Sequence, residues 1–159
     1  MISRFQMPVQ SYLYHRLTEK SAAEDVLQEV FVRVWKHRGR YESRDSLAAW
    51  IFTIARNLAL DHNDKTRRRR TEGIDAAQEP RSEAAGPERL AESSDMKTRI
   101  DAAIAALPEE QREVFLLREY GDITFAQIAR ETGCPLGTAL ARMRYAVLKL
   151  RESLGELDA

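Results

Sequence analysis

Apolar residues recur at spacings of three and four along almost the whole of this chain, and no alternation of apolar and polar residues is sustained anywhere. The first pattern is that of amphipathic helices and the second that of strands, so the sequence predicts an all-α fold. The expected helices cover about residues 5–17, 22–39, 46–70 and 96–107, then begin again behind residue 108, with two more on either side of residues 133–135.

Local signals mark several of the expected helix ends. Ser21 precedes the second helix and Glu24 stands three residues later, the arrangement of a capping box. Pro108 suits the first turn of a helix, because its backbone angle is fixed near the helical value.

A segment of low complexity separates two helical parts of the chain. Residues 72–94 read EGIDAAQEPRSEAAGPERLAESS, with two prolines, two glycines, many acidic residues and no aromatic residue. This is the composition of a flexible linker. We therefore expect an N-terminal domain at 1–71, an acidic linker at 72–94 and a C-terminal domain at 95–159. Each domain is near the lower limit of about 60 residues for independent folding.

The formal net charge is zero, but the charges are unevenly distributed. Residues 1–72 hold 14 Lys and Arg against 9 Asp and Glu, a net charge of +5. Residues 73–95 hold 2 against 6, a net charge of −4, and residues 96–159 hold 9 against 10, a net charge of −1. The neutrality is a cancellation between segments, so it does not argue against nucleic-acid binding.

Composition also excludes several classes of protein. No apolar run approaches the roughly 18 residues of a membrane span, and MISRFQMPVQSYLYHR lacks the apolar core and cleavage site of a secretory signal. Cys134 is the single cysteine, and His15, His37 and His62 are not at metal-ligand spacing with it or with one another. We expect a cytoplasmic protein with no metal, no cofactor and no membrane insertion.

The segment ITFAQIARETGCPLGTALARMRYAVLKLRESL carries the most specific pattern in the chain. Thr124 can cap a short helix whose Ile128 and Ala129 face inward, and Gly133 follows Ala129 by four residues to supply a tight turn. The small Ala129 allows a second helix, from residue 135 or 136 to about Leu154, to cross closely. This is the pattern of a helix-turn-helix.

The second helix of this segment has two sides when it is drawn at ~100° per residue. Donors and a small residue near the start of its outer side are what a helix that reads the major groove requires. Alternatively, Arg142 and Lys149 only keep a bundle surface solvated, and Tyr145 only covers the neighbouring helix. The expected core side comprises Leu136, Ala139, Leu140, Met143, Val147, Leu150 and Leu154, and the outer side comprises Thr138, Ala141, Arg142, Tyr145 and Lys149, with Arg144 at its flank.

The segment AAEDVLQEVFVRVWKHR predicts a helix with a broad apolar stripe. Its opposite face surrounds an exposed valine with charges of both signs, which suits a partner helix, although a single exposed apolar residue is also normal without any partner. The stripe comprises Ala23, Val26, Leu27, Val30, Phe31, Val34 and Trp35, and the opposite face comprises Asp25, Gln28, Glu29, Val32 and Lys36.

The segment LAAWIFTIARNLALDHNDKTRRRR predicts the central helix of a small bundle. Trp50 falls on its core side and is therefore more readily a core residue than a platform for a stacked base. Phe52 and Leu60 lie on the other side, where we expect them to pack against the first helix. The core side comprises Leu47, Trp50, Ile51, Ile54, Ala55 and Leu58.

Cationic residues with an aromatic neighbour accompany this helix. Proteins bind single strands in this way, with cations along the backbone and a ring or pocket for an unstacked base. A run of four arginines alone is more often a solvated or nonspecific phosphate-binding tail. The tract comprises Arg38, Arg40, Tyr41, Arg44, Arg56, Asn57, Arg67, Arg68, Arg69 and Arg70.

Together these segments resemble a sigma factor of bacterial RNA polymerase, of the extracytoplasmic-function group of the sigma-70 family. AEDVLQEVFVRVW is similar to the family's segment that binds core polymerase, and WIFTIARNLALDH with the following arginines resembles the segment that opens and reads the minus-ten element. The stretch from LPEEQREVF to KLRESL resembles the domain that reads the minus-thirty-five element. Where the family often has a basic residue and a serine, this chain has Leu140 and Ala141, which implies altered minus-thirty-five contacts.

The resemblance implies three sets of site residues, one for core polymerase and two for promoter DNA. The polymerase partners that it implies are the clamp helices of the largest subunit and the flap of the beta subunit. Residues 40–45 would hold a base flipped out of the non-template strand. The implied sets are Asp25, Gln28, Glu29, Val32, Arg33 and Lys36 for core polymerase; Arg40, Tyr41, Ser43, Arg44, Asp45, Arg56, Asn57, Arg67, Arg68, Arg69 and Arg70 for the minus-ten element; and Thr124, Thr138, Ala141, Arg142, Arg144, Tyr145 and Lys149 for the minus-thirty-five element.

The residues alone are compatible with three functions. The first is a sigma factor associated with the nucleoid when active, and otherwise occluded by an anti-sigma factor that can hold it at the membrane. The second is a sigma-like decoy that binds an anti-sigma factor and never engages DNA, although such a protein has no need of the arginines at 67–70. The third is an enzyme using Glu109, Glu110 and Glu113, but no histidine, cysteine or phosphate loop converges with them, and we expect no catalysis.

Overall fold

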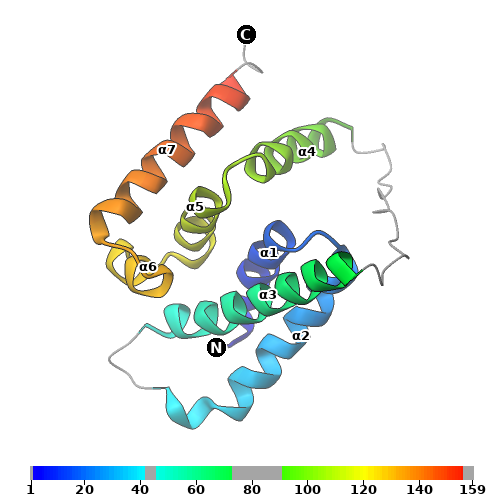
Figure 1. Cartoon of the computed structure of the whole chain (residues 1–159), viewed down its shortest axis with the longest axis vertical. Helices are drawn as coiled ribbons and strands as arrows, with labels where there is room; N and C mark the ends of the chain where they lie inside the picture. Colours follow the sequence, from blue (N-terminus) through cyan, green and yellow to red (C-terminus); the bar gives the residue numbers. More distant parts are fainter. Residues whose placement is uncertain (1, 42–45, 73–90, 156–159) are drawn as a thin grey trace. The chain divides into compact units, whose positions relative to one another are not determined.

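The computed structural model describes residues 2–41, 46–72 and 91–155, and every secondary-structure element among them is a helix. The predicted all-α class is confirmed. The helices fall into two compact units, one with α1 to α3 and the other with α4 to α7 (Figure 1). In chain order the elements are η1 (Ile2–Phe5), α1 (Gln6–Arg16), α2 (Lys20–Lys36), η2 (Arg38–Arg40), α3 (Leu47–Glu72), α4 (Ala91–Ala105), α5 (Glu109–Gly121), α6 (Phe125–Thr132) and α7 (Leu136–Gly155).

Most of the predicted linker, residues 73–90, lies outside the described residues. The two ends of the predicted linker are helical, since Glu72 is the last residue of α3 and residues 91–94 belong to α4. No helix in the described ranges is both long enough and apolar enough to cross a bilayer.

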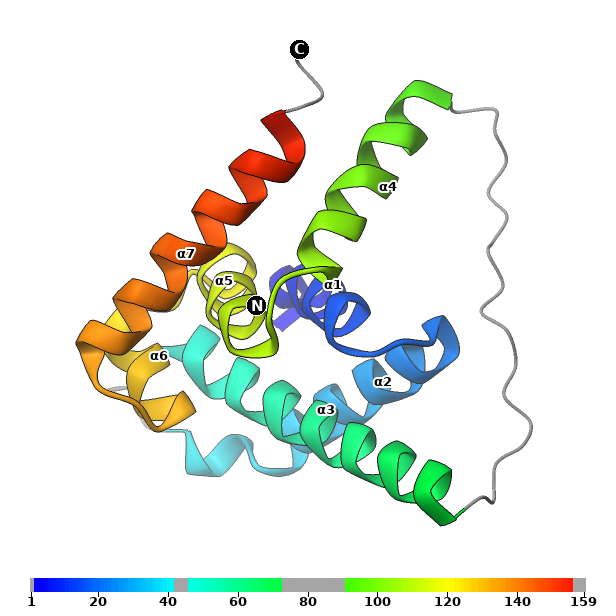
Figure 2. The ribbon, with the colours of Figure 1, turned by 45° about the horizontal axis from the view of Figure 1, so that its top comes forward.

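In the first unit, α2 and α3 lie side by side and run in opposite directions, and α1 packs against both (Figures 1 and 2). The rings of Tyr12 on α1 and Phe52 on α3 meet edge to face, with 5.5 Å between their centroids. Both side chains are fully buried, and such a pair adds about 0.5–1.5 kcal/mol to the effect of burial. The prediction that Phe52 packs against the first helix is confirmed, while Leu60 is half-buried.

The starts of α2 and α3 differ in how they are capped. The predicted cap at Ser21 is wrong, because the extended backbone ends at Glu19 and Ser21 already lies inside the helix, where its side chain is exposed. At the start of α3 the backbone N–H of Ala49 donates to the Ser46 hydroxyl oxygen at 2.9 Å. That contact satisfies one of the free N–H groups of the first turn.

The second unit is built around α5 and α7, which pack against each other, with α4 and α6 each against α7. Arg112 of α5 joins α4 to α5 by donating to the carbonyl oxygens of Ile104 (3.2 Å), Ala105 (3.0 Å) and Leu107 (2.7 Å). The first two carbonyls belong to the last residues of α4, where the helix dipole favours a cation, and Leu107 lies just beyond the helix. Pro108 occupies the N-cap of α5 rather than its first turn.

Candidate protein and nucleic-acid interfaces

The outer side of α2, here called the α2 face, holds all six residues predicted to contact a polymerase helix. Each of them is exposed: Asp25, Gln28, Glu29, Val32, Arg33 and Lys36. Arg33 and Glu29 form an ion pair at 3.1 Å across one turn, and Val32 between the charged residues is 53% exposed. The α2 face therefore offers one apolar contact surrounded by polar groups of both signs.

Trp35 belongs to the predicted apolar stripe of this helix, but it does not lie in the core, because its side chain is 61% exposed. The buried line of α2 runs through Ala23, Val26, Val30 and Val34. The neighbouring row at a spacing of four, Leu27, Phe31 and Trp35, passes from half-buried to exposed as the helix reaches its end. Trp35 stands next to Val32 on the helix surface, at a separation of three residues, so it extends the apolar part of the α2 face.

The part of the predicted minus-ten set that follows α2 is only partly described. Arg40 is exposed at the end of η2, and the half-buried Tyr41 packs against Trp50 of α3 with 5.6 Å between ring centroids. Trp50, predicted to be more readily a core residue than a stacking platform, is half-buried and in contact with Tyr41. Ser43, Arg44 and Asp45 lie outside the described residues.

The remaining members of that set lie along α3. Arg56 is half-buried and Asn57 exposed near the middle of the helix, and the arginine run (Arg67, Arg68, Arg69 and Arg70) is exposed near its end. At 1.5 Å per residue, α3 separates Trp50 from the arginine run by about 26 Å. The structure thus spreads the predicted DNA contacts along one helix instead of gathering them in one pocket.

The end of α3 carries a shallow, mostly cationic depression. It is lined by Lys65, Arg68, Arg69 and Glu72. Three positive charges at this spacing lie on one side of the helix, and they can accompany a phosphate backbone without recognising any base.

The turn of the predicted helix-turn-helix is confirmed. Thr124 caps α6 by accepting from the N–H of Gln127 at 3.2 Å, and the Gln127 side chain accepts from the Thr124 N–H, which completes a capping box. Gly133 ends α6 in the left-handed conformation at φ 69°, and the Cys134 N–H donates to the Ala129 oxygen at 3.0 Å. The Gly133 N–H also donates to the Arg130 oxygen at 3.4 Å. These last two bonds are those of a Schellman motif, which ends α6 before α7 begins.

The outer side of α7 carries the residues predicted to contact duplex DNA. Arg144, Tyr145 and Lys149 are exposed, whereas Thr138, Ala141 and Arg142 are half-buried. The guanidinium of Arg144 lies 5.5 Å from the centre of the Tyr145 ring. Thr124, assigned to the same set, uses its hydroxyl oxygen in the α6 cap.

The core side predicted for α7 is only partly right. Ala139 and Ala146 are fully buried, and Met143, Val147, Leu150 and Leu154 are half-buried. Leu136 and Leu140 are instead 49% and 45% exposed. The buried line follows the small alanines, at which neighbouring helices can approach closely, and the leucines beside that line remain uncovered.

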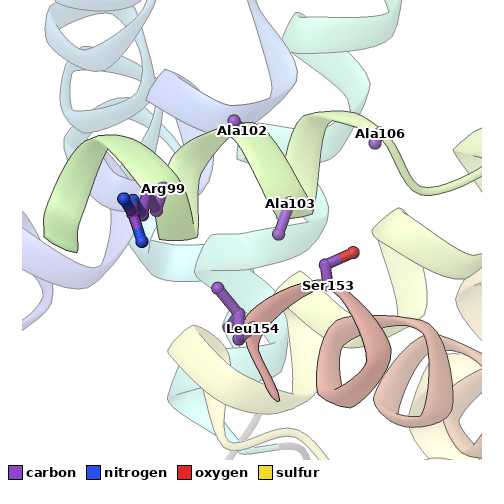
Figure 3. A pocket seen from close by; sticks show the side chains of 6 residues that line it. All are labelled: Arg99, Ala102, Ala103, Ala106, Ser153 and Leu154. Carbon is purple, nitrogen blue, oxygen red and sulfur yellow. The ribbon is translucent and has the colours of Figure 1, made fainter. Parts of the chain in front are cut away.

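A second shallow groove lies between α4 and α7 within the second unit (Figure 3). Figure 3 shows Ala103 of α4 pointing toward Ser153 and Leu154 of α7, with Arg99 further along α4 at one end. Its lining comprises Arg99, Ala102, Ala103, Ala106, Ser153 and Leu154. Arg99 is the one titratable group in this lining, and Asp95 pairs with it at 3.5 Å.

Two family models match the chain. The model described as Sigma-70 region 2 matches residues 1–69, and the model described as Sigma-70, region 4 matches residues 97–150. The first match covers α1, α2 and α3 as far as Arg69, which includes most of the arginine run, and the second covers most of α4 to α7.

Similar proteins carry the same description. The ECF RNA polymerase sigma factor RpoE of Cereibacter sphaeroides is 36% identical over 161 residues, covering 97% of this chain and 84% of that protein. The ECF RNA polymerase sigma factor SigL of Mycobacterium tuberculosis is 36% identical over 144 residues, covering 89% of this chain and 80% of that protein.

Two solved structures share the fold. The sigma factor RpoE of Bartonella quintana, in complex with the anti-sigma factor NepR, aligns with a TM-score of 0.71 at 22% identity, over 97% of this chain and 94% of that one. CnrH, in complex with the cytosolic domain of CnrY, aligns with a TM-score of 0.67 at 18% identity, over 99% of this chain and 86% of that one.

Proposed function

This chain belongs to the sigma-70 family of RNA polymerase sigma factors, as a member of its extracytoplasmic-function group, and we propose that it uses its three exposed surfaces for three separate contacts. The α2 face binds core polymerase, η2 and α3 bind the minus-ten element, and the outer side of α7 binds the minus-thirty-five element. The observation that carries this proposal is the combination, within one three-helix unit, of the α2 face with the arginine run on α3.

Each contact is assigned to a surface because of the chemistry of that surface. The α2 face has charges of both signs around Val32 and Trp35, which suits a protein helix better than a polyanion. The arginine run and Lys65 form a cationic surface that suits a phosphate backbone. The first turns of α7 follow a helix-turn-helix turn, which is the end that enters a major groove.

The contacts themselves supply the free energy for opening DNA in this proposal, and the chain performs no catalysis. Taking one base out of the stack costs a few kcal/mol. A polymerase-bound sigma factor can meet this cost through the phosphate contacts of α3 and the residues around Tyr41.

We also propose that a cytoplasmic anti-sigma partner controls the activity by covering the same surfaces. The solved structure of the Bartonella quintana sigma factor with NepR supports this, because this chain shares that fold over 97% of its length. The apolar part of the α2 face is a surface that such a partner can cover.

Reconstitution with core polymerase tests the main proposal. The chain is added to purified core enzyme on a library of random upstream sequences, and the transcripts are sequenced from their 5′ ends. We expect initiation behind a shared two-part sequence element, and none with core enzyme alone. A chain that binds an anti-sigma factor but neither binds core enzyme nor directs initiation would be a decoy, and the proposal would be wrong.

A further inference from the structure

Three large apolar side chains lie exposed on α7, in a single row. Leu136, Leu140 and Leu148 are 49%, 45% and 47% exposed, and Arg144 stands between the second and third of them. Residues separated by four positions are neighbours on a helix surface, so the four side chains form a continuous line, here called the leucine row. Single exposed leucines are ordinary, whereas several in one row are typical of a surface that contacts a partner.

The charges around the leucine row indicate the kind of partner. From Leu136 to Arg151 the helix carries four cationic side chains, Arg142, Arg144, Lys149 and Arg151, and no anionic one. A surface with this balance is attracted to a polyanion. Leu136 and Leu140 lie in the first two turns after the helix-turn-helix turn, where a helix of this motif approaches base edges.

The row of residues next to the leucine row begins with small side chains at the start of α7. Gly137 and Ala141 precede Tyr145 and Lys149 in it. A Cβ atom added to Gly137 would meet nothing within 4 Å, so packing inside the protein does not require glycine there. Because these side chains are small, another molecule can come close to the backbone of the first turns of α7 and reach both leucines.

The major groove offers one apolar group to such side chains, the C5-methyl group of thymine. From this geometry we infer that Leu140, with Leu136 beside it, reads thymine methyl groups in the upstream element that α7 contacts. The inference rests on the proposed function and adds to it a base preference. It assigns the preference to the side chains that the helical pattern had placed in the core.

Deoxyuridine provides the test, since it pairs as thymine does but lacks the methyl group. The upstream element is first identified by initiation from a random library with the full chain and core polymerase. Each thymine of that element is then replaced by deoxyuridine in a fluorescent duplex, and holoenzyme binding is measured by competition. We expect one or two positions at which loss of the methyl group weakens binding about threefold to fourfold.

The Leu140→Ala variant is expected to bind the original duplex more weakly and to lose the difference between thymine and deoxyuridine at those positions. Leu148→Ala is the matched control, because it removes a leucine of similar exposure from the same row two turns further along. Leu148→Ala should keep the full thymine preference. Alanine is favourable in an exposed helix, and circular dichroism of each variant checks its folding.

Three results would contradict the inference in different ways. Equal binding of thymine and deoxyuridine duplexes at every position would overturn the methyl contact and leave the proposed function standing. A Leu140→Ala variant that binds core polymerase more weakly in the absence of DNA would show that a protein covers the row. Failure of the wild-type chain to direct any initiation would overturn the proposed function, and the inference with it.

Discussion

The guanidinium of Arg38 lies 3.9 Å from the centre of the Trp35 ring, and Nη1 of the same group donates to the Trp35 carbonyl oxygen at 2.6 Å. One side chain thus satisfies a carbonyl at the end of α2 and covers one face of the exposed indole. Trp35 is thereby held beside Val32, at the edge of the α2 face.

Trp35→Ala should weaken core-polymerase binding about tenfold or more, because a partly exposed tryptophan in an interface is often among its strongest contacts. The cost to folding should be small, since an exposed cation–π contact contributes about 0.5–1 kcal/mol. Binding can be followed by fluorescence anisotropy with a labelled chain, and folding by urea denaturation.

Leu13→Ala serves as the opposite control, because Leu13 is fully buried in the first unit. It should cost about 2–5 kcal/mol in stability. If Trp35→Ala destabilises the first unit as much as Leu13→Ala and leaves polymerase affinity unchanged, Trp35 acts in folding and not in binding.

Reversing two charges in the arginine run, Arg68→Glu with Arg69→Glu, should weaken promoter binding on all sequences alike. The double variant loses two phosphate contacts, so the slope of log affinity against log salt should fall in magnitude by about 2. The measurement is holoenzyme affinity at four or five salt concentrations, on several unrelated promoters.

The matched control reverses two cations elsewhere, with Lys97→Glu and Arg99→Glu on α4. Both residues form exposed ion pairs within their helix, with Asp101 and Asp95, and such pairs contribute little to stability. An identical change of slope in the control would mean that total charge, and not the arginine run, governs the affinity.

Arg142→Ala and Lys149→Ala should affect DNA binding in different ways. Arg142 lies near the start of α7 and Lys149 two turns later, so the first is placed for base edges and the second for phosphate. Arg142→Ala should cost about 1–3 kcal/mol on the preferred upstream element and little on others. Competition between matched and scrambled duplexes measures this difference, and an equal loss on both for Arg142→Ala would remove its reading role.

Thr124→Ala should destabilise the second unit by about 1 kcal/mol, because it leaves the Gln127 N–H without its cap. Thr124→Ser keeps the hydroxyl and should retain most of the stability. Thermal unfolding monitored by circular dichroism compares the two variants, and equal destabilisation of both would show that the methyl group matters and the cap does not.

Helical periodicity predicted the elements well and their buried sides less well. The wheel of α7 placed Leu136 and Leu140 inward because it weighs residues by size and apolarity. The structure packs α7 along Ala139 and Ala146, since small side chains allow close helix contact. A one-helix pattern contains no information about where the neighbouring helix lies, so it cannot distinguish these two adjacent sides.

Some of the site residues could likewise be predicted from the sequence, and others could not. The α2 face was predictable because its charged residues exclude it from any core. The turn at Gly133 was predictable because glycine there has a local backbone cause, the left-handed conformation. The role of Arg38 was not predictable, because a stack on Trp35 depends on where the chain bends after α2, which no local spacing specifies.

The arginine run stands on a helix that continues beyond its buried part. Asn63 still donates to the Arg16 carbonyl oxygen at 3.2 Å, and Thr66 is the last half-buried residue of α3. The stretch from Arg67 to Glu72 is exposed throughout and spans about 9 Å at 1.5 Å per residue. A projecting stretch of this length is marginal as an isolated helix, and the mutual repulsion of four arginines favours its unwinding until anions approach. The phosphates of bound nucleic acid would therefore neutralise the arginines and stabilise the end of α3. The amide hydrogens of its last turns should exchange quickly in the free protein and slowly on a promoter.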